Sequence, residues 1–352
     1  MTYPQGRAER PRRQLHLGTS PPRQRDSPVM IRRPPSRRVV SNAITHHPIP
    51  APMTPSSRRL LLLLALAALP LAASAADRRT LVHDGIERHY TVRVPERLPE
   101  GRVPLVLVLH GGAGNAENAE EMTGFTAKAR REGFIVVYPE GTGRFEHRFL
   151  AWNAVHCCGP AMTGKVDDTG FVRALLDRLA ADLPVDTRRV YATGLSNGGM
   201  MVHRLGIALP DRFAAIAPVV ATVFGDEPRP ASPVAALMIN GALDTSVPPA
   251  GGPPGGRVTS AWDGTPTRPA QAQGDFWAAA NGCAPAPDER VDGTVTRWQY
   301  RCTPGREVEV LLVGDNGHAW PGGRPGSLRG DRPSRTFDAT DAIWSFFKAH
   351  TK

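Results

Sequence analysis

The feature that most constrains this chain is a turn in which a serine stands between two glycines. The turn, Gly194-Leu195-Ser196-Asn197-Gly198, follows a β-branched run at 189–193 and precedes an amphipathic segment. A strand that enters a helix through so sharp a turn holds its serine in a strained conformation, and the glycines leave room for the neighbouring chain. The pattern predicts a parallel-sheet scaffold and a nucleophilic serine, although an ordinary glycine-rich turn before a helix can match the same five residues.

A serine hydroxyl becomes a good nucleophile only when a base takes its proton, and a carboxylate must hold that base. On scaffolds with this turn, the chain order is serine, acid, histidine, each at the carboxyl end of a strand. Asp244 follows the apolar run 234–240, and His318 lies in a glycine-rich loop after the run 308–313. We therefore expect Ser196, Asp244 and His318 to be the catalytic residues.

Other roles for these residues stay open at this point. Asp244 can equally serve as a turn residue, and His318 can pack against Trp320. Asp315 is a rival acid, but it lies only three residues from His318, where reaching the far imidazole nitrogen is awkward. Asp168 stands before a helical segment, where an N-cap is wanted, and we interpret it as a structural or site-rim residue.

An acyl transfer site also needs N–H donors for the negative charge that develops on the substrate oxygen. The apolar run 104–109 opens into the glycine-rich loop 110–115. We expect one donor at Gly112 or Ala113 and the other at the N–H of Asn197. A phosphate-binding loop is the competing interpretation, but the Gly-Lys-Ser/Thr ending of such loops is absent from the sequence.

By itself, the net charge of +10 suggests nucleic-acid binding, but the excess of basic residues is confined to the N-terminal part of the chain. Residues 1–59 hold twelve arginines and two acidic residues, so the rest of the chain is close to neutral. We expect residues 1–52 to be a disordered basic extension, or an upstream segment that is not translated if Met53 is the true start. We expect no nucleic-acid partner.

Residues 53–76 have the pattern of a secretory signal peptide. Two arginines precede the apolar run 60–69, and an Ala-rich segment with an Ala-x-Ala pattern follows. The run is too short for a membrane span, so we expect cleavage near Ala75 or Ala76, secretion to the extracellular space or periplasm, and no stable membrane anchor.

The four cysteines suit an oxidising compartment. We favour a disulfide between Cys283 and Cys302, while Cys157 and Cys158 either form a vicinal bridge or stay reduced. The spacing of His156, Cys157 and Cys158 is not that of a zinc site, and we expect neither a metal nor a cofactor.

From residue 77 onward, strands alternate with helices, as in an α/β domain with a mostly parallel twisted sheet and helices on both faces. We expect one catalytic domain, 77–352. Its predicted strands lie at 80–83, 89–94, 104–109, 134–138, 189–193, 213–219, 234–240, 294–300 and 306–313. Its predicted helices lie at 116–131, 168–182, directly after Ser196, and at 268–281 and 337–348.

Together these motifs resemble the secreted esterase family that includes polyhydroxybutyrate depolymerases and feruloyl or acetylxylan esterases. The stretches that carry the resemblance are Leu109 to Gly112, Trp152-Asn153 with Cys157 to Gly159, Val166 to Phe171, Tyr191 to Met201, and Gly317 to Gly323. The resemblance implies an α/β-hydrolase fold and a serine carboxylic ester hydrolase without a cofactor. The resemblance also implies that Ser196, Asp244 and His318 are the catalytic residues.

The resemblance does not name the ester. Gly112 stands where polyester-degrading members often have cysteine, so a small ester, a plant cell-wall ester and a polyester all remain open as substrates. We predict that Trp320, His110 and Trp152 contact the substrate. A serine peptidase of the same fold and a non-catalytic binding protein on this scaffold are the alternatives, and the sequence does not indicate an oligomeric state.

Overall fold

The structure is a computed structural model that describes residues 78–256, 259–326 and 330–352. The predicted basic extension 1–52, the predicted signal peptide 53–76 and the cleavage expected near Ala75 or Ala76 lie outside the described residues. In the described ranges, no helix is both long and apolar enough to cross a membrane.

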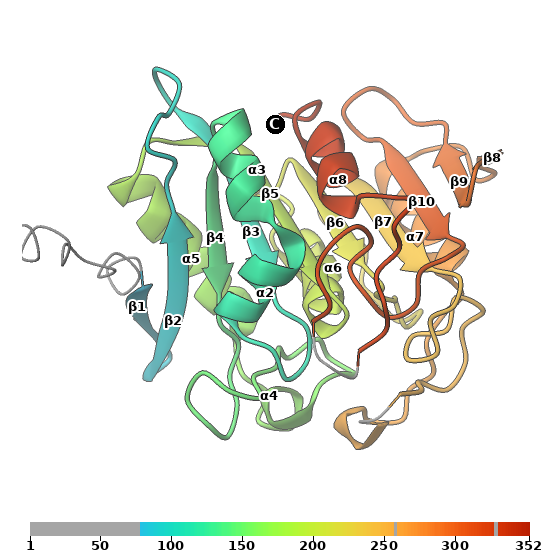
Figure 1. Cartoon of the computed structure of the whole chain (residues 1–352), viewed down its shortest axis with the longest axis horizontal. Coiled ribbons are helices and arrows are strands. Elements are labelled where there is room, and N and C mark those ends of the chain that lie inside the picture. Colours follow the sequence, from blue (N-terminus) through green and yellow to red (C-terminus); the bar gives the residue numbers. More distant parts are fainter. Residues whose placement is uncertain (1–77, 257–258, 327–329) are drawn as a thin grey trace, which may run out of the picture. The chain divides into compact units, whose positions relative to one another are not determined.

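The described residues form one mixed sheet whose strands lie in the order β1-β2-β4-β3-β5-β6-β7-β10-β9-β8 (Figure 1). The strands are β1 (Arg78–His83), β2 (Ile86–Arg93), β3 (Val103–Leu109), β4 (Ile135–Pro139), β5 (Val185–Leu195), β6 (Ala215–Val219), β7 (Ala235–Gly241), β8 (Asp288–Asp292), β9 (Val295–Tyr300) and β10 (Val308–Val313). From β4 to β10 all neighbours are parallel, and an antiparallel pair closes each edge. This is the predicted α/β-hydrolase type of sheet.

Helices cover both faces of this sheet because its central strands are apolar on both sides. The helices are α2 (Ala116–Thr123), α3 (Phe125–Glu132), α4 (Gly159–Thr163), α5 (Asp168–Asp182), α6 (Asn197–Ala208), α7 (Ala270–Asn281) and α8 (Ala339–Phe347). Side chains of α5, α6 and α7 pack in one core cluster, and those of α2, α3 and α8 pack in the other. Figure 1 shows α2, α3 and α8 together in front of the sheet.

Alternate residues of β3 show how one strand serves both cores. Leu105 and Leu107 belong to the first cluster, whereas Val106 and Val108 belong to the second. All four side chains are buried. Burial on both faces explains why this strand appears in the sequence as an uninterrupted apolar run.

The structure differs from the sequence prediction in several elements, and the five-residue helix α4 is one that was not predicted. The single helix predicted at 116–131 is two helices, because Gly124 between them adopts the left-handed conformation at φ 67° and caps α2. Strand β8 was not predicted. Its five residues are all exposed and its ladder runs only along β9, so it lacks the apolar pattern by which strands are recognised.

Both cysteine pairs are joined in the structure, Cys283 with Cys302 and Cys157 with Cys158. The first pair lies where the chain leaves α7 and where it leaves β9. The second pair lies at the end of the loop between β4 and α4, in a small apolar cluster with Met200 of α6.

Candidate active site

The carboxyl ends of β3, β5, β7 and β10 lie along one edge of the sheet, and each is followed by a predicted site residue. Ser196 stands between β5 and α6 with φ 56° and ψ −122°, a strained conformation for a residue with a side chain. Its N–H donates to the carbonyl of Val219 at 2.9 Å, which fixes the turn to β6. The strained serine predicted from the glycine pattern is present.

Gly198 shows why the turn needs glycine. A Cβ at this position would lie 2.4 Å from the carbonyl oxygen of His110 and 2.6 Å from that of Leu109. The start of α6 therefore packs directly on the backbone that leaves β3. This close approach brings the glycine-rich loop 110–115 beside Ser196.

The structure brings Ser196, His318 and Asp244 together although they are far apart in the sequence. His318 Nε2 lies 2.8 Å from Ser196 Oγ, and His318 Nδ1 lies 2.7 Å from Asp244 Oδ2. With the proton on Nδ1, the imidazole donates to the carboxylate and its Nε2 accepts from the serine hydroxyl. This arrangement can deprotonate the serine and stabilise the imidazolium that results.

Asp244 is held as an acceptor by its own turn. Its side chain is buried, and its Oδ1 accepts the N–H groups of Ser246 and Val247, both at 2.8 Å. The turn role and the imidazole role considered for Asp244 therefore coexist, one on each carboxylate oxygen. The rival acid Asp315 instead accepts from the hydroxyl groups of Ser334 and Thr336.

Asp331 is a site residue that the sequence analysis did not identify. Its Oδ2 accepts the backbone N–H of His318 at 2.6 Å, and the residue lines the cavity in front of Ser196. A Cβ at Gly317 would lie 2.4 Å from the same oxygen, so this glycine is required for the contact. Asp331 lies in an irregular segment, and no local pattern distinguishes it from other surface aspartates.

Two backbone N–H groups beside Ser196 are suitable for an oxyanion. Asn197 is the first residue of α6, where an N–H has no acceptor within the helix. Gly112 lies beside Asn197, since a Cβ at Gly112 would lie 3.7 Å from the Cβ of Asn197. The structure contradicts the prediction of Ala113 as the alternative donor, because the Ala113 N–H already donates to the carbonyl of Leu150 at 2.8 Å.

The side chain of Asn197 fastens the loop after β4 to this turn. Its Oδ1 accepts the N–H of Trp152 at 2.7 Å, and its Nδ2 donates to the carbonyl of the same residue at 3.0 Å. The neighbouring Asn153 N–H donates to Asp168 Oδ2 at 2.7 Å, while Asp168 Oδ1 accepts from buried Arg88 at 2.6 Å. Asp168 is thus a buried support of the site, and the predicted N-cap role belongs to Asp167.

The three residues predicted to contact substrate are placed in the core instead. Trp320 packs edge-on against Phe125 and donates to Thr340, and Trp152 donates its indole N–H to the carbonyl of His110. All three side chains are fully buried, and none lines the cavity at Ser196. The prediction is wrong for these three residues, because their rings fill the core beside the site and leave no surface for substrate.

His110 and His203 are buried as neutral rings. His110 Nδ1 donates to the carbonyl of Gly111, and its Nε2 accepts the N–H of Gly141 at 3.0 Å. His203 of α6 likewise accepts the Trp277 indole N–H and donates to Gln273. Burial lowers the pKa of both rings to about 4.

A cavity of about 660 Å³ opens over Ser196 and His318. The loop after β3, the loop before Leu150 and several apolar side chains line this cavity. The lining includes Gly111, Gly112, Ala113, Gly114, Asn115, Met122, His147, Arg148, Phe149 and Leu195. Phe149 is 64% exposed and meets Phe145 edge-on. The exposed ring of Phe149 in the cavity lining is suited to apolar or aromatic groups.

Comparison with known proteins identifies the family of this chain. The family model described as esterase PHB depolymerase matches residues 88–248. The chain is 32% identical over 292 residues to "Putative esterase NocK" of Nocardia uniformis subsp. tsuyamanensis, which covers 78% of this chain and 83% of that protein. It is 30% identical over 230 residues to feruloyl esterase B of Piromyces equi, covering 63% of this chain and 41% of that protein.

The acetyl xylan esterase from Aspergillus awamori has a similar structure, with a TM-score of 0.50 and 14% sequence identity over 77% of this chain and 98% of that chain. At this identity the likeness concerns the fold alone. The fold, the family model and the similarity to NocK confirm the resemblance predicted from the motifs. The chain therefore belongs to the esterase PHB depolymerase family, whose members are carboxylic ester hydrolases with the α/β-hydrolase fold.

Proposed function

We propose that this protein is a secreted serine esterase in which Ser196, His318 and Asp244 form the catalytic triad. The observation that carries the proposal is the unbroken series of hydrogen bonds from Asp244 through His318 to Ser196, with distances of 2.7 and 2.8 Å. A binding protein without catalytic activity has no need for a strained serine that is paired with a base. Such strain is kept where the surrounding structure serves a reaction.

The reaction proceeds in two steps. His318 takes the proton of Ser196 as the serine oxygen attacks the ester carbonyl, and Asp244 stabilises the imidazolium. The N–H groups of Asn197 and Gly112 donate to the oxyanion, and the collapse of the tetrahedral intermediate releases the alcohol, which takes the proton from His318. Water then attacks the acyl-enzyme by the same route and releases the acid.

We propose that the acyl group is apolar or aromatic. Phe149, Met122 and Leu195 supply apolar surface beside Ser196, and these residues replace buried Trp320 as the surface for the acyl group. The name of the Piromyces relative, a feruloyl esterase, agrees with an aromatic acid. The open mouth of the cavity also leaves room for a bulky alcohol, such as a cell-wall polysaccharide.

The test is a hydrolysis panel with purified protein and its Ser196→Ala variant. The substrates are methyl ferulate, acetylated xylan, short p-nitrophenyl esters, amorphous polyhydroxybutyrate and a matched peptide p-nitroanilide. We expect wild-type activity on methyl ferulate and the short esters and none in the variant, with equal thermal midpoints. Equal activity of the two proteins refutes the triad, and faster cleavage of the anilide than of the esters indicates a peptidase.

Secretion is a separate proposal, supported by the arginine pair, the apolar run 60–69 and the Ala-rich segment that follows. Sequencing the N-terminus of protein recovered from the culture medium or periplasm tests it. We expect the mature chain to begin at Ala76 or Asp77. A mature chain that retains Arg32 contradicts both the signal peptide and the start at Met53.

A further inference from the structure

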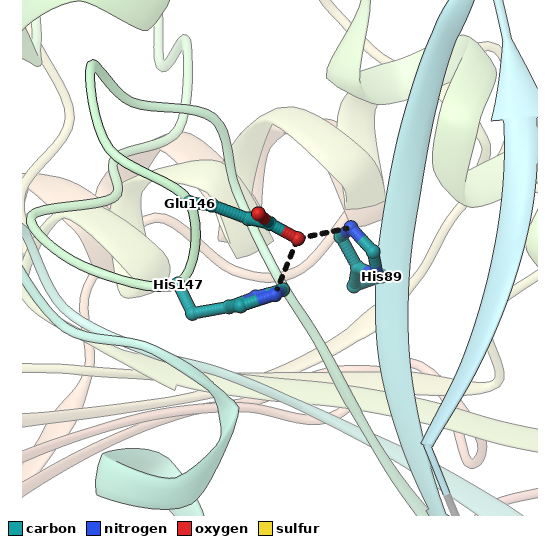
Figure 2. Close-up of side chains that lie close together, drawn as sticks. All are labelled: His89, Glu146 and His147. Carbon is teal, nitrogen blue, oxygen red and sulfur yellow. Dashed lines mark hydrogen bonds and ion pairs between the residues drawn. The ribbon is translucent and has the colours of Figure 1, made fainter.

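Outside the proposed triad, two histidines and a glutamate meet near the edge of the sheet. They are His89, Glu146 and His147, and one ligand atom from each lies within 4.8 Å of the other two. Glu146 Oε1 is 2.9 Å from His147 Nε2 and 3.8 Å from His89 Nε2. Figure 2 shows both imidazole rings directed at this one carboxylate oxygen. No other such group was found within the described ranges.

The three residues come from two elements that are distant in the sequence. His89 is on β2, whereas Glu146 and His147 belong to the loop between β4 and α4. The histidine side chains are 19% and 27% exposed, so the rings are fixed by packing while solvent reaches the point where they converge. The rings also contact each other edge-on, with centroids 4.5 Å apart.

A second carboxylate orients one of these rings from behind. His147 Nδ1 lies 2.7 Å from Glu140 Oε2, and Glu140 is buried and paired with Arg78 at 3.0 Å. This contact places the Nδ1 proton of His147 toward Glu140 and leaves the Nε2 lone pair facing Glu146. Metal-binding histidines almost always donate their second ring nitrogen to a carboxylate or carbonyl in this way.

Although the sequence led us to expect no metal, we propose that His89, Glu146 and His147 bind a divalent zinc ion, with solvent as the fourth ligand. Two imidazole nitrogens and one carboxylate oxygen are a donor set that zinc prefers, and calcium or magnesium would require more oxygen ligands. In tetrahedral zinc sites, neighbouring ligand atoms are about 3.3 Å apart. The observed 2.9 and 3.8 Å lie on either side of this value and the third pair of ligand atoms lies within 4.8 Å, so side-chain adjustments of about an ångström bring all three to zinc-binding distance.

The ion would restrain the loop that forms one side of the cavity at Ser196. The carbonyl of His147 accepts from Asn115 Nδ2 at 3.0 Å, and the carbonyl of Leu150 accepts the N–H of Ala113 at 2.8 Å. Both contacts hold the segment that follows Gly112. The role of the zinc is therefore structural: it ties β2 to the loop that supports the proposed oxyanion donor. Its binding is measurable without any ester, so it stands or falls independently of the esterase proposal.

The experiment uses the full-length protein freed of metal, titrated with zinc chloride by calorimetry and, separately, with cobalt chloride by visible spectroscopy. Glu146→Gln is the first variant, because a side chain that is 73% exposed can be changed without loss of folding. His89→Asn is the second. His83→Asn is the matched control, since His83 is also a partly exposed histidine, on β1, that pairs with one carboxylate, Asp167.

We expect one zinc ion per chain in the wild type and in the control, with a rise in thermal midpoint of roughly 5 °C at a hundredfold excess over Kd. Glu146→Gln and His89→Asn should weaken binding at least a hundredfold and abolish the tetrahedral cobalt absorption. Glu140→Gln should weaken binding by about 10- to 100-fold while leaving the three ligands in place.

Equal zinc affinity in the wild type, Glu146→Gln and His89→Asn overturns the proposal. Histidines near the N-terminus, such as His46 and His47, are common to every variant, so any binding by them appears equally in all titrations. A wild type that binds no zinc also overturns it and leaves the cluster as a hydrogen-bonded contact between β2 and the loop.

Discussion

The loop after β3 and the loop after β10 have similar local sequences but different roles in the proposed site. Each follows a buried parallel strand, contains several glycines and carries a histidine, His110 in the first and His318 in the second. His110 is fully buried between the carbonyl of Gly111 and the N–H of Gly141. His318 lies between Asp244 and Ser196 and lines the cavity.

The difference lies in the partners of each imidazole. Both ring nitrogens of His110 face fixed backbone groups of opposite polarity, so only one neutral tautomer fits, and a proton on Nε2 would face the Gly141 N–H. His318 instead faces a carboxylate and a hydroxyl group, those of Asp244 and Ser196. We infer that the first loop contributes backbone donors to the site, whereas the second contributes a side-chain base.

Exchanging each histidine for glutamine tests whether the two loops have these different roles. His318→Gln should lower kcat on a p-nitrophenyl ester on the order of 10⁴- to 10⁶-fold, because the base is lost, with little change in thermal midpoint. His110→Gln should mainly lower stability, by about 1–3 kcal/mol, because a glutamine amide does not replace both the packed ring and its two hydrogen bonds, to Gly111 and Gly141. Measuring kcat and urea midpoints of both variants decides the matter. A reversed pattern would falsify the division of roles.

The backbone role of the first loop can be tested at Gly112. Gly112→Pro removes the N–H and should lower kcat by about 10²- to 10³-fold. Gly112→Ala keeps the N–H, and its Cβ would meet only the Asn197 Cβ at 3.7 Å, an ordinary contact, so near-normal activity is expected. If the proline variant keeps normal kcat at an unchanged thermal midpoint, the oxyanion donor lies elsewhere.

The pH dependence of stability sharpens the contrast, since His110 and His203 are buried neutral with a pKa of about 4. In the unfolded chain they titrate near 6.5, so between pH 6.5 and 4 the unfolded state binds more protons. The stabilisation that comes from the two neutral rings should therefore be fully present above pH 6.5. It should be lost as the pH drops toward 4, by about 3 kcal/mol for each ring. Urea midpoints at pH 7 and 4.5 measure this loss.

His110→Gln is the control for this pH effect. The variant should lose less stability than the wild type between the two pH values, because only His203 still titrates in this window with a lowered pKa. Equal losses in the two proteins would show that His110 is not buried in the neutral form.

The smallest effect is expected at Asp331, which positions the second loop through the backbone N–H of His318. Asp331→Ala removes this acceptor and should lower kcat/KM by about tenfold, the equivalent of one hydrogen bond. The conservative variant Asp331→Asn keeps an oxygen acceptor and should recover most of the activity. Equal rates for the wild type and both variants argue that the loop is positioned without Asp331.

Much of the fold could be predicted because its signals are local. Buried parallel strands such as β3 and β10 are continuous apolar runs, and the amphipathic helices between them follow with small errors at their ends. The break at Gly124, the five-residue helix α4 and strand β8 were not predicted, because none of them has a clear periodic apolar pattern. A glycine is compatible with a helix end or interior, and an exposed edge strand has no apolar face.

Of the proposed site, the sequence determined the chemistry-bearing residues that belong to a strand end: Ser196 in its glycine turn, Asp244 after β7 and His318 after β10. Local pattern suffices there because backbone strain and chain order are properties of the sequence itself.

Tertiary structure alone decided which neighbours face the cavity. It buried Trp320, His110 and Trp152, occupied the N–H of Ala113, and brought Asp331 to the loop of His318. It also brought His89 to Glu146 and His147. Burial and long-range hydrogen bonding depend on segments separated by tens of residues, and no window of sequence carries that information.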